Sequence, residues 1–143
     1  MKRELVAYCG LYCGACSFKL AVDDADFDHV LKMPTGYDQY KNKSFDLSCP
    51  GCKLENICGQ CNIRDCAQKN QINHCGLCNE FPCPKVKQLN NDGVPHHSTV
   101  IDNLLLLQKV GEEQWLEIQR QQWTCSCGRR LSWYYTECPT CTR

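Results

Sequence analysis

The chain has 143 residues, a length that fits one compact domain or one domain with a small appendage. Lysine and arginine together number 16, as do aspartate and glutamate, so the formal net charge is zero. This balance argues against strong binding to a nucleic-acid backbone, which usually requires a basic excess, and against an anionic membrane surface as a partner.

The first predicted elements surround a cysteine motif at residues 9–16. A short extended run over residues 4–8 is expected before the motif. After it, Ser17 is predicted to cap a helix over residues 17–31, because apolar residues recur there at roughly helical spacing. The acidic residues of this helix, predicted to form a solvated face near His29, are Asp23, Asp24, Asp26 and Asp28.

No helical or alternating period persists between residues 48 and 84, and cysteines arrive there every few residues. We expect this stretch to form turns and short helices held by metal rather than by an apolar core. One or two helical turns are predicted over residues 63–69.

A cluster of turn-forming residues at 90–95 is the clearest internal boundary of the chain. Beyond it, Ser98 or Thr99 is predicted to cap a helix that ends at Gly111. A second helix over residues 112–122 follows, so a tight helical corner is expected at this glycine. The adjacent His96 and His97 are predicted to be polar loop residues rather than metal ligands.

The last segment resembles a small zinc ribbon, in which two cysteine pairs flank ten aromatic-rich residues. Its predicted ligands are Cys125, Cys127, Cys138 and Cys141. Four thiolates make a closed zinc site that stabilises a segment too short to build its own core. Arg129, Arg130, Trp133, Tyr134 and Tyr135 offer a possible surface for nucleic acid, but such aromatics more often pack on the ribbon itself, and we favour that interpretation.

Cysteine content is the most unusual property of the sequence, with 15 cysteines against 4 histidines. Such chains are either secreted disulfide scaffolds or metal-binding proteins. The residues before the first cysteine lack the apolar run of a signal peptide, and no segment approaches the roughly twenty apolar residues of a membrane helix. We therefore expect a cytoplasmic protein with reduced thiols and no membrane partner.

The spacing of the cysteines favours metal over disulfides, because five pairs have the form Cys-x-x-Cys and each pair can direct two sulfurs at one cation. The predicted metal ligands are Cys9, Cys13, Cys16, Cys49, Cys52, Cys58, Cys61, Cys66, Cys75, Cys78, Cys83, Cys125, Cys127, Cys138 and Cys141. Outside the tail, eleven cysteines plus His74 would supply three four-coordinate sites, so three to four zinc ions are expected. Bridged clusters, or fewer full sites with free thiols, satisfy the same count.

Four cysteine motifs resemble those of the domain of unknown function 3795 family, found in bacteria and archaea. They are Cys-Gly-Leu-Tyr-Cys-Gly-Ala-Cys at 9–16, Cys-Pro-Gly-Cys at 49–52, Cys-Gly-Gln-Cys-Asn-Ile-Arg-Asp-Cys-Ala at 58–67 and Cys-Gly-Leu-Cys-Asn-Glu-Phe-Pro-Cys at 75–83. The resemblance covers residues 9–91 and, with ribbon-tailed members, extends along the chain. It implies a cytoplasmic, zinc-binding protein without an assigned activity. The Cys-x-Cys spacing of Cys125 and Cys127 is one residue shorter than usual, which affects the geometry of that site.

Together these observations predict a small, irregular, metal-stapled α+β fold with several zinc knuckles, a few helices and a C-terminal zinc ribbon. Residues 1–91 would form a cysteine-rich multi-metal domain, residues 92–123 a helical pair packed on it, and residues 124–143 the ribbon-like tail. The sequence contains no recognisable nucleophile–base pair or phosphate-binding loop, so a non-enzymatic binding or adaptor module with a protein partner is expected. The alternatives are an iron–sulfur redox protein that uses the N-terminal cysteines, or a metal-handling protein with one labile site.

Overall fold

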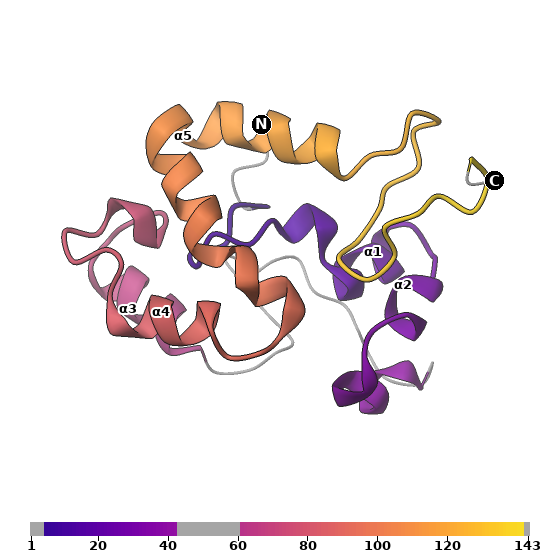
Figure 1. Cartoon of the computed structure of the whole chain (residues 1–143), viewed down its shortest axis with the longest axis horizontal. Helices are drawn as coiled ribbons and strands as arrows, with labels where there is room; N and C mark the ends of the chain where they lie inside the picture. Colours follow the sequence, from indigo (N-terminus) through magenta and orange to yellow (C-terminus); the bar gives the residue numbers. More distant parts are fainter. Residues whose placement is uncertain (1–4, 43–60, 142–143) are drawn as a thin grey trace.

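The structure, a computed structural model, describes residues 5–42 and 61–141. Within these ranges all regular elements are helical, and β-structure is limited to three isolated bridges (Figure 1). The helices, with 3₁₀ helices labelled η, are η2 (Cys13–Ala15), α1 (Ser17–Asp23), α2 (Asp28–Leu31), η3 (Thr35–Lys41), α3 (Asn62–Lys69), η4 (Cys75–Leu77), α4 (Pro84–Asn90), η5 (Pro95–Thr99) and α5 (Val100–Gln122). The fold is thus small and mostly helical, with less β-structure than the sequence predicts.

The helix predicted over residues 17–31 is divided in two, and this part of the prediction is wrong. The chain leaves helical geometry between α1 and α2, where Ala25 has a positive φ of 51°. The Asp26 carboxylate accepts a hydrogen bond from the backbone N–H of Asp28 at 3.2 Å. Short acidic side chains bind nearby backbone groups in this way and so compete with helix continuation. Ser17 is also not the cap, because Cys16 occupies that position and Ser17 is completely buried.

Helix α5 contains the predicted helical pair and its corner. Gly111 has φ 84° and ψ 167°, and the two arms of α5 meet there at the sharp bend visible in Figure 1. This backbone conformation is accessible to glycine and strained for other residues. The predicted capping bonds are absent, because the hydroxyls of Ser98 and Thr99 donate instead to the carbonyls of Pro95 and His96.

The main core lies under the two arms of α5. Trp115, fully buried, meets the Tyr12 ring edge-on with 6.0 Å between ring centroids. Helix α4, which the sequence did not predict, begins with a proline at its first position and buries Val86 in the same cluster. The buried members of this core are Val6, Tyr12, Ala15, Ile63, Cys75, Val86, Val100, Leu104, Leu107, Trp115 and Leu116.

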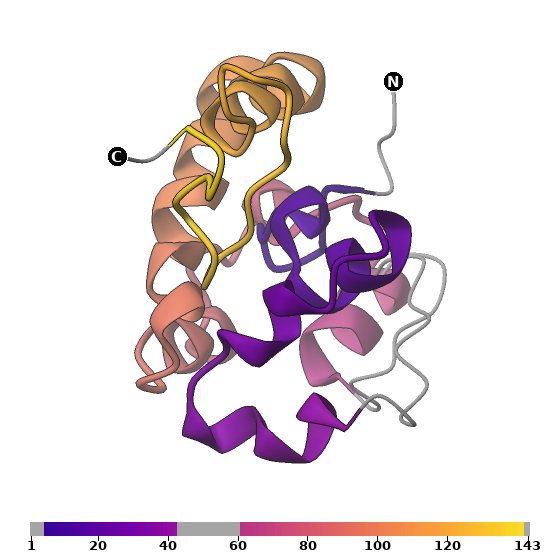
Figure 2. The same ribbon diagram turned by 90° about the vertical axis from the view of Figure 1, so that its right-hand side faces the viewer.

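A smaller cluster connects the N-terminal helices to the C-terminal tail. Phe18 of α1 and Val30 of α2 are buried in it, and Tyr134 of the tail packs against it from outside. Figures 1 and 2 both place the tail beside α1 and α2. In the described part of the chain, no helix has the length and apolar character needed to span a membrane.

Candidate metal centre

The first half of the candidate centre is a tight turn directly after α5. The Cys125 N–H donates to the Arg129 carbonyl and the Gly128 N–H donates to the Cys125 carbonyl, both at 2.8 Å. Gly128 has a φ of 95°, a conformation that favours glycine. The turn therefore presents Cys125 and Cys127 together despite their short Cys-x-Cys spacing.

The second half is the turn at Cys138 and Cys141. Between the halves, Ser132 pairs with Tyr135 in an isolated bridge, and a second bridge joins Thr124 to Arg130. The strands expected for a zinc ribbon are replaced by these two bridges in the described tail. Each bridge consists of a single residue pair.

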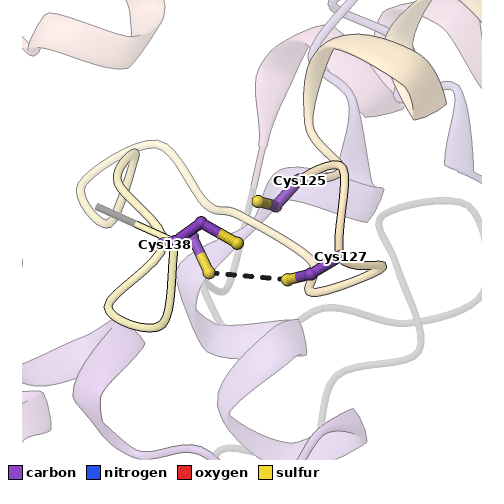
Figure 3. Close-up of side chains that lie close together, drawn as sticks. Cys125, Cys127 and Cys138 are labelled. Carbon is purple, nitrogen blue, oxygen red and sulfur yellow. Dashed lines mark hydrogen bonds between the residues drawn. The ribbon is translucent and has the colours of Figure 1, made fainter. Parts of the chain in front are cut away.

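The four sulfurs converge on one point. All lie within 4.8 Å of one another, and the Sγ atoms of Cys127 and Cys138 are 3.6 Å apart. Figure 3 shows Cys125 and Cys127 on one turn facing Cys138 on the other. With zinc–sulfur bonds of about 2.3 Å, tetrahedral geometry places sulfurs roughly 3.8 Å apart. The observed spacing therefore fits a single tetrahedral ion.

Backbone N–H groups favour the ionised form of two of the four thiols, those of Cys125 and Cys138. The Cys127 N–H and the Cys141 thiol lower the pKa of Cys125. Burial raises the pKa of Cys138, but the N–H groups of Cys141 and Thr140 and the neighbouring thiols outweigh it and hold the pKa at about 6. The pKa of Cys141 is raised to about 12 by the thiols of Cys125, Cys127 and Cys138. Cys125 and Cys138 therefore ionise more readily than a free cysteine and Cys141 less readily, and a cation would neutralise the charge of the ionised thiols.

Among the contacts that attach the tail to the N-terminal segment are a buried polar contact and a backbone bond. His29 Nδ1 lies 2.7 Å from Ser132 Oγ, and both residues are almost completely buried. The Trp133 N–H donates to the Ala15 carbonyl at 3.1 Å. Neither contact was predicted, because nothing in the local sequence of either partner indicates it.

The acidic residues of the N-terminal segment also contact the tail. Asp24 forms an ion pair with Arg130, and Asp26 forms one with Arg129. Asp24 is exposed, as predicted for a solvated acidic face, and Asp26 is half-buried, but the sequence did not predict that both pair with the tail. The two arginines are paired within the protein, which removes much of the positive charge that a nucleic-acid surface on the tail would need.

Aromatic side chains of the tail pack mainly on the protein itself, as we favoured from the sequence. Trp133 stacks on His96 with 4.1 Å between ring centroids and an interplanar angle of 5°. Tyr134 Oη lies 2.7 Å from His96 Nδ1, and Tyr135 is buried. His96 is consequently a packing residue on η5 rather than a loop residue, and its ring also contacts that of His97.

The other predicted ligands do not form a comparably close group. Within residues 5–42 and 61–141, three or more potential ligand atoms come this close only at Cys125, Cys127, Cys138 and Cys141. Of the remaining predicted ligands, Cys49, Cys52 and Cys58 lie outside the described residues. His74 is buried, and its Nδ1 accepts the N–H of Gly76 at 3.1 Å. The described cysteines outside the tail are Cys9, Cys13, Cys16, Cys61, Cys66, Cys75, Cys78 and Cys83.

The fold and this sulfur group define a small helical protein with a four-cysteine group able to hold a metal ion. The family model described as "Protein of unknown function (DUF3795)" matches residues 5–88, which is more than half of the 143-residue chain. The chain therefore belongs to the DUF3795 family, as its cysteine motifs predict. The four-cysteine group lies beyond the matched region. Searches of curated proteins and of solved structures found no match.

Proposed function

We propose that this protein is a non-enzymatic metal-binding module in which Cys125, Cys127, Cys138 and Cys141 hold one structural zinc ion. The observation that carries the proposal is the convergence of four sulfurs within 4.8 Å of one another, on turns whose N–H groups donate to the sulfurs of Cys125 and Cys138. Four thiolates complete a tetrahedral zinc site and leave no position for water or substrate. Such a site supplies folding energy rather than catalysis.

The spacing of the sulfurs supports a single ion over a polynuclear iron–sulfur cluster. A cluster places several iron and sulfide atoms between its cysteine ligands and so holds their sulfurs farther apart than one ion does. The 3.6 Å separation of the Cys127 and Cys138 sulfurs is close to the roughly 3.8 Å expected around one zinc ion. A mononuclear iron site with the same four ligands differs from zinc in being coloured and redox-active.

The proposed role of the ion is to hold the tail in the shape that contacts α1 and α2. The segment between the two cysteine turns contains Ser132, whose hydroxyl meets buried His29. It also forms part of a cavity of about 420 Å³ lined by Lys32 and residues 134–139. Zinc would therefore fix both the attachment of the tail and one wall of this cavity. A binding or adaptor role for a protein partner in the cytoplasm follows as the proposed use of such a surface.

The test is the metal content of the full chain, purified without oxygen and without a metal-affinity column. We expect colourless protein that contains zinc, and the loss of one zinc per chain in Cys127→Ser and in Cys138→Ser. Ser126→Ala, a change in the same turn that removes no ligand, should keep the wild-type zinc content. Hydrogen exchange of the Trp133 amide, which donates to Ala15, should accelerate in the cysteine variants while the α5 amides remain protected.

Two results would contradict the proposal. Unchanged zinc content in both cysteine variants would mean that the tail does not hold the ion. Iron in place of zinc, with acid-labile sulfide and visible absorbance, would instead support the iron–sulfur alternative.

A further inference from the structure

A cavity of about 200 Å³ lies between α5 and the tail. Asn103 lines it from the arm of α5 before Gly111, Gln119 lines it from the arm after Gly111, and Trp133 lines it from the tail. The bend at Gly111 (Figure 1) therefore brings polar side chains from both arms to one place. The volume is below the roughly 300–1,000 Å³ of pockets for drug-sized ligands, so the cavity suits a molecule of one or two rings.

Aromatic side chains form much of the cavity wall. The rings of Tyr12, Trp123, Trp133 and Tyr134 line it together with the ring of His96. Contacts within the protein hold several of these rings in place, because Trp133 stacks on His96 and Tyr134 Oη lies 2.7 Å from His96 Nδ1. Fixed aromatic walls favour a flat ligand, which can pack a whole face against a ring.

The lining of the cavity is uncharged at neutral pH. Among the described residues that line it, none is an acid, a lysine or an arginine. Burial, assisted by the charge of His97, lowers the pKa of His96 to about 3, and burial raises the pKa values of Tyr12 and Tyr134, so the imidazole and both phenols are neutral. A charged ligand would lose its hydration here without gaining an opposite charge, so the cavity favours a neutral molecule.

Two side-chain amides line the cavity, and each has one group left for a ligand. The Trp123 indole N–H donates to Gln119 Oε1 at 3.3 Å, and the Asn103 amide donates through Nδ2 to the Gly10 carbonyl at 2.9 Å. Because an indole N–H only donates and a carbonyl only accepts, these bonds fix which end of each amide is used. Gln119 is 5 % exposed, and within the described part of the chain its Nε2 donates to no acceptor and Asn103 Oδ1 accepts from no donor. The cavity thus offers one amide donor and one amide acceptor.

We propose that this cavity binds a small, neutral ring amide, which is a flat heterocycle of one or two rings in which a carbonyl lies beside a ring N–H, as in a pyrimidine or purine base. The ligand carbonyl accepts from Gln119 Nε2, and the ligand N–H donates to Asn103 Oδ1. The flat ring packs against the aromatic wall, where stacking tolerates different ring systems. Binding also gives the buried Gln119 amide the partner that it lacks.

The proposal goes beyond the metal-binding function and does not depend on it. Cys125, Cys127, Cys138 and Cys141 are all described, and none of them lines this cavity. The tail still supplies Trp133 and Tyr134 to the wall. Binding is therefore measured on the full-length protein with its metal content as purified, so failure of the zinc proposal leaves this test intact.

The test is an NMR titration of wild-type protein with uracil at millimolar concentrations. The chain has three tryptophans, whose indole N–H signals report on separate places. Trp123 and Trp133 line the cavity, whereas Trp115 is fully buried in the main core. We expect uracil to shift the signals of Trp123 and Trp133 saturably and to leave that of Trp115 nearly unchanged. Uridine, titrated in the same way, distinguishes a base carried on a sugar from a free heterocycle, and saturable binding of either supports the proposal.

Two analogues test the ring N–H without any change to the protein. Uracil methylated on both ring nitrogens has no N–H to donate to Asn103 Oδ1, so it should bind at least about tenfold more weakly than uracil. Thymine carries its added methyl group on a ring carbon and keeps both N–H groups, so it should retain most of the affinity. The proposal is overturned if uracil and uridine give no saturable shift, if the N-methylated analogue binds as well as uracil, or if thymine loses as much affinity as that analogue.

A pair of variants tests the donor on α5. Gln119→Met keeps a side chain of similar length but has no N–H, so it should weaken uracil binding at least about tenfold. The matched control is Gln121→Met, because Gln121 also belongs to α5 but donates to Glu117 at 3.0 Å and does not line the cavity. Wild-type affinity is expected in this control, and wild-type affinity in Gln119→Met would overturn the proposed contact. The analogue series decides the proposal if Gln119→Met does not fold.

Discussion

His96 shows how a single side chain ties the tail to the rest of the protein. Its ring lies against Trp133, and its Nδ1 is 2.7 Å from Tyr134 Oη. Burial, assisted by the charge of His97, lowers the pKa of His96 from 6.5 to about 3. The imidazole is therefore neutral in the folded protein throughout the pH range in which a free histidine becomes protonated.

This lowered pKa predicts destabilisation by acid. Between about pH 6.5 and 3 the unfolded chain binds a proton at His96 that the folded chain does not, so stability falls as pH falls. The contribution of His96 is fully present above pH 6.5, and at pH 5 about 2 kcal/mol of it should be lost relative to pH 7. Urea unfolding at the two pH values measures the difference.

The control for this prediction is His96→Phe, which keeps an aromatic ring against Trp133 but cannot titrate. Acid also weakens metal binding and protonates His29, whose pKa is likewise lowered by burial. Both effects are common to the wild type and the variant, so only the difference between their pH dependences reports on His96. Parallel pH dependences in the two proteins would show that His96 is readily protonated in the folded state.

At the scale of the element, the corner of α5 depends on one glycine. An alanine Cβ at position 111 would meet no atom within 4 Å, so crowding is not the obstacle. The obstacle is the backbone, because φ 84° with ψ 167° is strained for any residue with a Cβ. Gly111→Ala should therefore lower the free energy of unfolding by about 1–3 kcal/mol.

The matched control is Gly36→Ala in η3. A Cβ there also meets no atom within 4 Å, but the backbone does not adopt a positive φ. This substitution should leave stability unchanged or raise it by up to about 1 kcal/mol, because alanine restricts the unfolded chain. Urea unfolding of both variants separates strain from the general effect of replacing glycine, and equal changes would refute strain at Gly111.

The elements that the sequence predicts well are those whose signals are local. The helix over residues 63–69 corresponds to α3, and Gly111 marks the corner of α5 because a helix-ending glycine follows a strong apolar pattern. Helix α4 is hidden within the cysteine-rich stretch, where its short apolar pattern is not distinctive. Helices α1 and α2 are separate because the Asp26 carboxylate binds a backbone N–H group and so competes with helix continuation. The spacing of apolar residues carries no information about this competition.

The same distinction applies to the candidate metal sites. The tail centre follows from spacing, because its two cysteine turns are close in the chain and need only one reversal to meet. How Cys66, Cys75 and Cys83 are grouped depends instead on the packing of α3, η4 and α4. Spacing alone indicates that these cysteines are available for metal, and it does not specify which of them would share an ion.

At the scale of the whole molecule, the attachment of the tail joins residues about a hundred positions apart. His29 and Ser132 are separated by 103 positions, and Asp24 and Arg130 by 106. No pattern in a single sequence specifies such pairs. The tail is therefore where predictions from the sequence are least complete, although its cysteines are the most readily recognised.

The buried polar contact, rather than the ion pairs, should hold the tail in place. Ser132 and His29 are at most 1 % exposed, so Ser132→Ala leaves a buried ring nitrogen without its partner, at a cost of about 1–3 kcal/mol. The Asp24–Arg130 pair is open to solvent, so Asp24→Ala should cost less than about 1 kcal/mol. Urea unfolding of zinc-loaded protein, with exchange of the Trp133 amide as a local probe, compares the two variants. A larger effect of Asp24→Ala, diminished by added salt, would instead assign the attachment of the tail to surface charge.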